Sequence, residues 1–90
     1  MSQSMLGGDP TEMAAMASQF DRQAEAVQAV IAALGKEAAK VGTVWTGQGA
    51  VRFKQAWDNY QVSFQRMSDE LREASRVIGT YRQNIESATS

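Results

Sequence analysis

Two runs of apolar residues that repeat at intervals of seven constrain this 90-residue chain more than any other feature. The first run has one row of larger side chains and, four positions after most of them, a row of smaller ones. The two rows are Met13, Phe20, Val27, Leu34 and Val41, and Ala17, Ala24, Ile31 and Ala38. Apolar rows at this spacing make one face of an α-helix. The first run therefore predicts a helix of about four heptads.

The second run has the same periodicity but carries larger side chains. Its rows are Phe53, Tyr60, Met67, Ala74 and Tyr81, and Trp57, Phe64, Leu71, Ile78 and Ile85. The two runs are separated by Gly42, Gly47 and Gly49, and three glycines in eight residues mark a turn. Large side chains on one helix can interdigitate with small ones on the other. The sequence thus predicts an all-α fold, an antiparallel two-helix hairpin.

The predicted hairpin is a single domain that spans residues 1–90. We expect a mobile tail over 1–9, a first helix over about 10–41, a Trp-x-Gly turn over about 42–49, a second helix over about 50–86 and a short tail over 87–90. Asp9 is a suitable helix cap and Pro10 suits the first helical position. Thr46 is a candidate cap for the second helix.

The apolar stripes are wider than a strict two-row seam, because Met16 and Val30 broaden the first and Ala56 and Val77 broaden the second. A broad stripe suits a helix that contacts more than one neighbour. We therefore expect two hairpins to dimerise into a four-helix bundle. The residues predicted to form the hairpin or dimer core are Phe20, Val27, Ile31, Leu34, Phe53, Trp57, Tyr60, Phe64, Met67, Leu71 and Ile78.

Composition argues against catalysis and against several classes of ligand. The chain has no cysteine and no histidine, so the usual neutral-pH base and the commonest metal ligand are both missing. Asp69 and Glu73 alternate with arginines on the predicted outer face, a spacing typical of surface ion pairs. We expect no enzyme activity, no cofactor and no metal.

The same composition argues against nucleic acid as a partner and against stable insertion into a membrane. A net charge of -1 gives no electrostatic attraction to nucleic acid. The aromatic stripe that begins at Phe53 has helical spacing, which favours core packing over base stacking. No apolar segment is long enough to span a membrane. The first nine residues lack the features of a secretory signal peptide, so export would require another route.

Trp45, in the turn, has two interpretations that the residues alone leave open. The ring either folds over the end of the bundle or stays partly exposed as a binding surface. Val51 and Val62 lie off both predicted rows, where they are ordinary exposed valines or a small docking patch.

The stretch VWTGQGAVRFKQAWDNY, residues 44–60, resembles the WXG family of early-secreted-antigen-like proteins around its turn and second-helix start. Chain length, two heptad helices and the mid-chain Trp-x-Gly agree with this resemblance. It implies a hairpin that dimerises head-to-tail and is exported folded through a bacterial type VII system, with the type VII export ATPase as a partner. The chain would then be cytoplasmic before export and secreted or at the cell surface afterwards.

The resemblance also implies a two-part export signal. Trp45 and Gly47 match its turn element, and Tyr81 matches the tyrosine of its tyrosine-x-x-x-acid element. The acid is displaced by one position, because Ile85 stands where it is expected and Glu86 follows. Either Glu86 replaces it, or the partner carries the motif, which we favour.

Both homodimers and paralogous heterodimers occur in this family. Arginine outnumbers lysine two to one and alanine is abundant, which is typical of a high-GC genome and hence of an actinobacterium. Paired paralogues of this family are common in actinobacteria, which slightly favours a heterodimer. The alternative function is a non-exported structural or adaptor protein, for which the apolar rows alone suffice.

Overall fold

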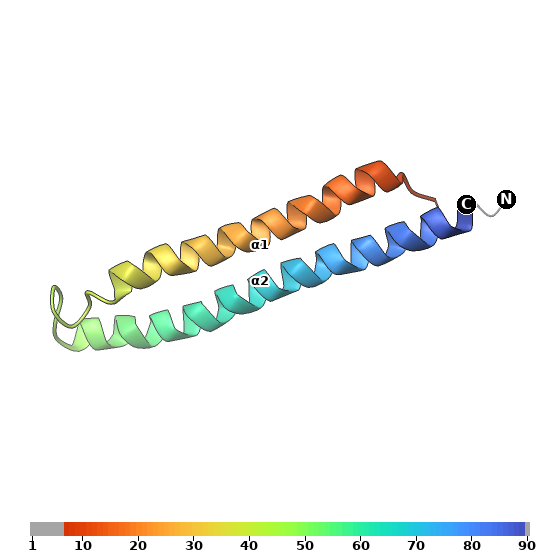
Figure 1. Ribbon diagram of the computed structural model, residues 1–90. Coiled ribbons are helices and arrows are strands. Elements are labelled where there is room, and N and C mark those ends of the chain that lie inside the picture. Colours follow the sequence, from red (N-terminus) through yellow and green to blue (C-terminus); the bar gives the residue numbers. More distant parts are fainter. Residues whose placement is uncertain (1–6, 90) are drawn as a thin grey trace.

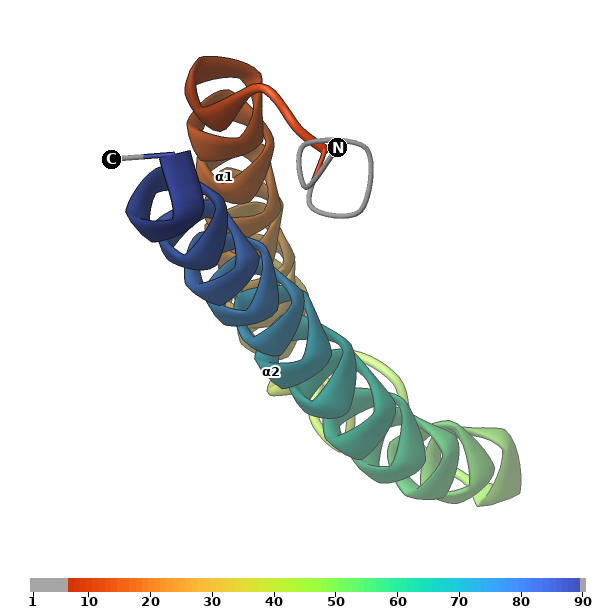
Figure 2. The same ribbon diagram turned by 90° about the vertical axis from the view of Figure 1, so that its right-hand side faces the viewer.

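The computed structural model describes residues 7–89 and confirms the helical hairpin. Helix α1 spans Pro10–Ala38 and helix α2 spans Gln48–Thr89. They lie side by side and antiparallel, so the start of α1 and the end of α2 share one end of a rod of 67 × 17 × 13 Å (Figures 1 and 2). Most of the predicted N-terminal tail, and Ser90 of the C-terminal one, lie outside the described residues.

The start of α1 follows the capping pattern read from the sequence. The Asp9 carboxylate accepts hydrogen bonds from the backbone N–H groups of Thr11 and Glu12, at 3.0 and 3.3 Å. These donors have no partner within the helix, so the carboxylate satisfies them, and Pro10 fills the first helical position. Asp9 is therefore confirmed as the cap.

Three contacts fix the register between the helices. The Ser68 hydroxyl donates a hydrogen bond to the Ala24 carbonyl at 3.1 Å. Gly35 lies beneath the Trp57 ring, and the Arg82 guanidinium donates from Nε to the Pro10 carbonyl at 3.2 Å. All three agree on one antiparallel alignment, in which residue 25 of α1 lies level with residue 67 of α2.

The face that α2 turns toward α1 combines a predicted row with one that the sequence did not indicate. Trp57, at 8% exposure, and Ile85, at 7%, belong to the predicted row. Ser68 and Ser75 are also buried, at 0% and 7%. Ala24 is fully buried opposite Ser68, so the helices approach closely at a layer of two small residues. That close approach leaves no space there for the larger row that contains Phe53, Tyr60 and Met67.

Candidate functional site

The largest candidate site is a set of exposed apolar side chains. Among the described residues, eleven large apolar side chains are between 37% and 60% exposed, and seven of these form the candidate site. They are Met16, Val30 and Leu34 on α1, and Phe53, Tyr60, Met67 and Tyr81 on α2. Five of these belong to the predicted rows and four of them to the predicted core set, so within one hairpin those four are only partly covered.

These seven residues lie on one face of the hairpin, as helical geometry shows. On α2 the exposed row precedes the inward row by four residues, as Phe53 precedes Trp57. On α1, Met16 precedes the inward Ala17 by one residue and Leu34 precedes Ala38 by four. A step of one residue changes the direction of a side chain about the helix axis by about 100°, and a step of four residues changes it by about 40° in the same sense. Because the helices are antiparallel, the preceding side of each faces the same way. We call this surface the apolar face.

The opposite face of the hairpin carries many of the charged residues. It holds the residues that follow the inward rows by one or four positions, among them Asp21, Glu25, Asp58, Asp69, Arg72 and Arg76, all exposed. Val51 and Val62, at 58% and 60% exposure, also lie there. Val62 lines an open groove of about 560 Å³ with Gln61, Arg66 and Asp69. We call this surface the charged face.

The acidic residues on α2 form surface contacts of the kind that their spacing predicted. Glu73 pairs with Arg76, and Gln65 donates a hydrogen bond to the Asp69 carboxylate at 3.2 Å. The hydrogen bond from Arg76 lowers the pKa of Glu73, so this carboxylate stays ionised at neutral pH. A general acid needs the opposite shift. Among residues 7–89, no three acidic side chains gather as metal ligands would.

At the turn, the Trp45 ring rests on the hairpin and is still 47% exposed. Its centroid lies 5.7 Å from that of Phe53, with the ring planes tilted by 51°. A Cβ added at Gly49 would lie 3.2 Å from Cζ2 of Trp45, so the ring packs closely on this glycine and would have to shift slightly for a larger residue. Trp45 thus combines features of both interpretations, and it joins the apolar face through Phe53.

Backbone geometry explains a second glycine of the turn. Gly47 has φ +101°, a conformation that side-chain-bearing residues rarely adopt, and a Cβ there would meet no atom within 4 Å. Gly47 is therefore required for the path of the chain, whereas Gly49 allows the Trp45 ring to pack closely on the start of α2.

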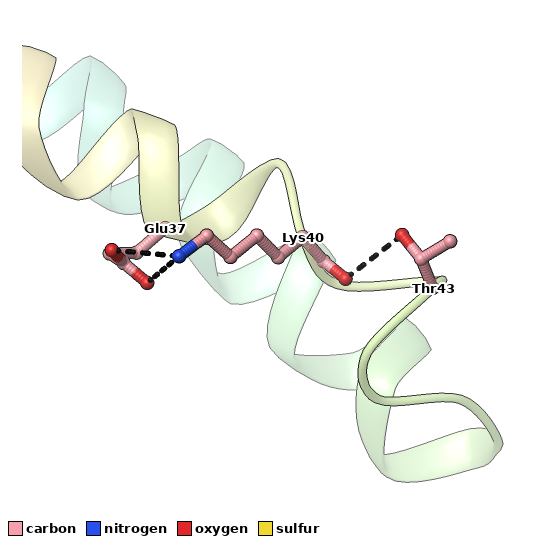
Figure 3. A network of polar contacts seen from close by, with 3 residues as sticks. All are labelled: Glu37, Lys40 and Thr43. Atoms are coloured by element: carbon pink, nitrogen blue, oxygen red, sulfur yellow. Dashed lines mark hydrogen bonds and ion pairs between the residues drawn. The ribbon is translucent and has the colours of Figure 1, made fainter.

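Hydrogen bonds around Lys40 hold the turn where the chain leaves α1. The Lys40 ammonium binds both carboxylate oxygens of Glu37, at 3.0 and 3.1 Å (Figure 3). The Lys40 carbonyl accepts from the backbone N–H groups of Thr43 and Val44 and from the Thr43 hydroxyl, at 3.1, 2.9 and 3.2 Å. The chain leaves α1 in a defined direction, and Val44 is left 80% exposed beside Trp45.

The two residues of the candidate C-terminal signal point in different directions. Tyr81 is 60% exposed on the apolar face. Glu86 forms an ion pair with Arg82 at 3.2 Å, and Arg82 also binds the Pro10 carbonyl. Five residues along an α-helix correspond to a rotation of about 140°, so Tyr81 and Glu86 do not share one face.

A hairpin of two long helices, joined by a glycine-bearing turn that displays a half-exposed tryptophan, belongs to the class of small Trp-x-Gly helical hairpins. The family model described as "Proteins of 100 residues with WXG" matches residues 7–89. The chain belongs to this WXG100 family, the early-secreted-antigen-like family of type VII secretion, which confirms the resemblance. No curated protein and no solved structure matches the chain significantly.

Family membership agrees with the helical fold and with the exposed apolar face. WXG100 proteins are non-enzymatic helical proteins that typically pair with partners. Over residues 7–89, neither helix combines the length and hydropathy needed to cross a bilayer.

Proposed function

We propose that this chain is a type VII secretion substrate that is exported as a folded helical dimer and acts by protein–protein interaction. The apolar face is the main observation that supports this proposal. Large apolar side chains that line one whole side of a rod are unusual on a monomeric soluble protein, whereas a partner would remove them from water. The charged face suits contact with solvent.

The export signal would combine elements from the two subunits. Trp45 and Gly47 lie at the hairpin tip, and Tyr81 lies near the opposite end, so one subunit keeps them far apart. In a head-to-tail dimer the tip of each hairpin lies beside the open end of its partner. Trp45 of one subunit would then approach the C-terminal part of α2 in the other subunit. The acid of the tyrosine-x-x-x-acid element would come either from a partner that carries the motif or from Glu86. The type VII export ATPase would read this composite surface.

Export can be tested in the native host by comparing the secreted and cytoplasmic amounts of the chain. Deleting the export ATPase should retain the protein in the cytoplasm. Trp45→Ala should reduce export, because it removes half-exposed aromatic surface at the tip. Val44→Ala is the matched control, since Val44 is the neighbouring exposed residue. An unchanged secreted amount without the ATPase would refute the proposal.

The alternative is a non-exported structural or adaptor protein. The contacts of Trp45 with Phe53 and Gly49 favour it, because a ring that only caps the hairpin would make the same contacts. In that case Trp45→Ala should lower the free energy of unfolding without a selective export defect. Measuring thermal unfolding and export on the same variant separates the two functions.

A further inference from the structure

We propose that the hairpin tip, on its charged-face side, is a docking site for an acidic segment of another protein. The segment would place an apolar side chain in a pocket beside Val51 and a carboxylate between Lys36 and Lys54. The site lies apart from the apolar face that the proposed dimer uses, so it adds a second interaction surface to the hairpin.

The tip of the hairpin is basic, in contrast to the rest of the rod. Residues 35–54 contain four of the nine lysine and arginine residues, including every lysine of the chain, and one of the ten acidic residues. The remainder of the chain contains five basic and nine acidic residues. The single acid of the tip, Glu37, is already paired with Lys40 (Figure 3). An acidic ligand would therefore be attracted to the tip and repelled by the rest of the hairpin.

Two of the tip lysines lie on the charged face without an ionic partner. Lys36 follows the inward Gly35 by one residue on α1. Lys54 follows the buried Ala50 by four residues on α2, so both lysines are turned to the charged face. In the observed register residue 36 is level with residue 56, which puts the two lysines within about one helical turn of each other along the rod. In the described part of the chain neither ammonium forms an ion pair.

An open apolar pocket, which we call the tip pocket, lies beside these lysines. It is lined on the turn by Val41 and Thr46 and on α2 by Ala50, Val51 and Lys54. Its volume of about 250 Å³ is below the roughly 300 to 1,000 Å³ of sites that enclose a drug-sized ligand. The tip pocket therefore suits a single side chain of a bound polypeptide, and its valine and alanine walls favour an apolar one.

Val51 and Lys54 join the apolar and the basic parts of the site. Val51 is 58% exposed and lies off both the inward row and the apolar face, so neither the hairpin nor the proposed dimer covers it. Lys54 can contribute its aliphatic stem to the pocket wall while its ammonium stays in water, where it can pair with a carboxylate. An apolar residue with an acidic neighbour would satisfy both groups at once.

This combination favours an acidic polypeptide over other anions. A phosphate or a nucleic-acid backbone brings negative charge without an apolar side chain, so it would leave the tip pocket empty. A membrane with anionic lipids would attract the lysines, but a flat surface has no use for a pocket that holds one side chain. The lipid surface is the alternative that the experiment has to separate.

The test is a titration of the isotope-labelled full chain with a defined peptide, followed by the NMR shifts of its backbone amides. The probe is the capped peptide Glu-Asp-Leu-Glu-Asp, and the comparison peptide has serine in place of leucine. At low ionic strength the leucine peptide should shift the amides of Val51 and Lys54 saturably. It should bind at least about threefold more tightly than the serine peptide, because only leucine fills the tip pocket. Added salt should weaken both peptides.

Matched variants separate the tip pocket from unspecific attraction. Val51→Thr should weaken the leucine peptide about threefold or more, because a hydroxyl replaces a methyl group in the pocket wall. Val62→Thr, at 60% exposure on the same face, should leave binding unchanged. The double variant Lys36→Gln and Lys54→Gln should weaken both peptides about threefold or more. Arg66→Gln, which removes a cation of the same face outside the tip, should not.

Binding that depends on the leucine, on Val51 and on the two lysines supports the proposal. The proposal is overturned if millimolar peptide shifts no amide of the tip. It is also overturned if Val51→Thr binds the leucine peptide as tightly as Val62→Thr does, since the lysines alone would then account for the attraction. Vesicles that contain phosphatidylglycerol provide the last comparison. If they shift the amides of Val51 and Lys54 and the peptide does not, a lipid surface occupies the site and the proposed protein partner is wrong.

Discussion

Ser68→Leu is the sharpest test of how the two helices pack. Ser68 is the largest fully buried side chain among the described residues, and Ala24 opposite it is fully buried too. A leucine at this position brings several additional carbon atoms to a point where the helices already touch. The seam would have to open there, or the new side chain would have to leave its preferred rotamer.

The expected destabilisation has two parts. Overpacking a close contact costs about 1 to 3 kcal/mol. Losing the hydrogen bond to the Ala24 carbonyl costs about another 1 kcal/mol, because that carbonyl keeps its helical partner. For a domain of this size, a loss of roughly 2 to 4 kcal/mol lowers the Tm by about 10 to 20 °C or more. Ser68→Ala should cost only the hydrogen bond.

Circular dichroism during thermal and urea unfolding measures both effects. The protein concentration must be equal throughout, because dimerisation would make the Tm concentration-dependent. Ser18→Leu is the matched control, since Ser18 is exposed on the charged side of α1. The close packing is refuted if Ser68→Leu is as stable as the unmodified chain, or no less stable than Ser18→Leu.

Four further substitutions test the turn, α2 and the open end. Gly47→Ala should lower the free energy of unfolding by about 1 to 3 kcal/mol, because φ +101° strains any residue with a Cβ; urea unfolding would detect it. Gly49→Ala should displace the Trp45 ring, shift its fluorescence and reduce export with little loss of stability, since its Cβ meets the ring and not the backbone; unchanged fluorescence and export would contradict this. Gly79→Ala should raise the free energy of unfolding by up to about 1 kcal/mol, because its Cβ meets nothing within 4 Å and alanine favours the helix; a lower Tm would contradict it. Arg82→Gln should accelerate amide exchange in the first turn of α1 and the last turns of α2, because both contacts of the guanidinium are lost; unaltered exchange there would show that the contact does not hold this end together.

The fold could be predicted from the sequence because its determinants are local and periodic. Rows at intervals of seven define helices, glycines define the turn, and Asp9 followed by Pro10 defines the start of α1. Trp45 and Gly47 were identifiable because a large ring and a glycine stand together where the periodicity stops.

The inner face of α2 could be predicted only in part. Both large rows fit a helix seam, and periodicity does not say which of them faces α1 and which faces outward. The answer depends on the small residues of α1, which bring the helices close enough for Ser68 and Ser75 to be buried. A buried serine gives no hydropathy signal. The one available clue was Ser68 itself, at the level of the small Ala24 once the helices are aligned.

This division of α2 into two faces links the packing of the hairpin to its proposed pairing. The contact with α1 uses small side chains at the centre, where Ala24 meets Ser68, and leaves Tyr60 and Met67 about half exposed on the adjacent side. A hairpin that buried both large rows of α2 against α1 would have little apolar surface left for a partner. Because the close contact at the centre uses alanine and serine, the row that contains Phe53, Tyr60 and Met67 stays available without opening the hairpin. Two prefolded hairpins can then associate as rigid units, which suits a dimer that must stay folded during export.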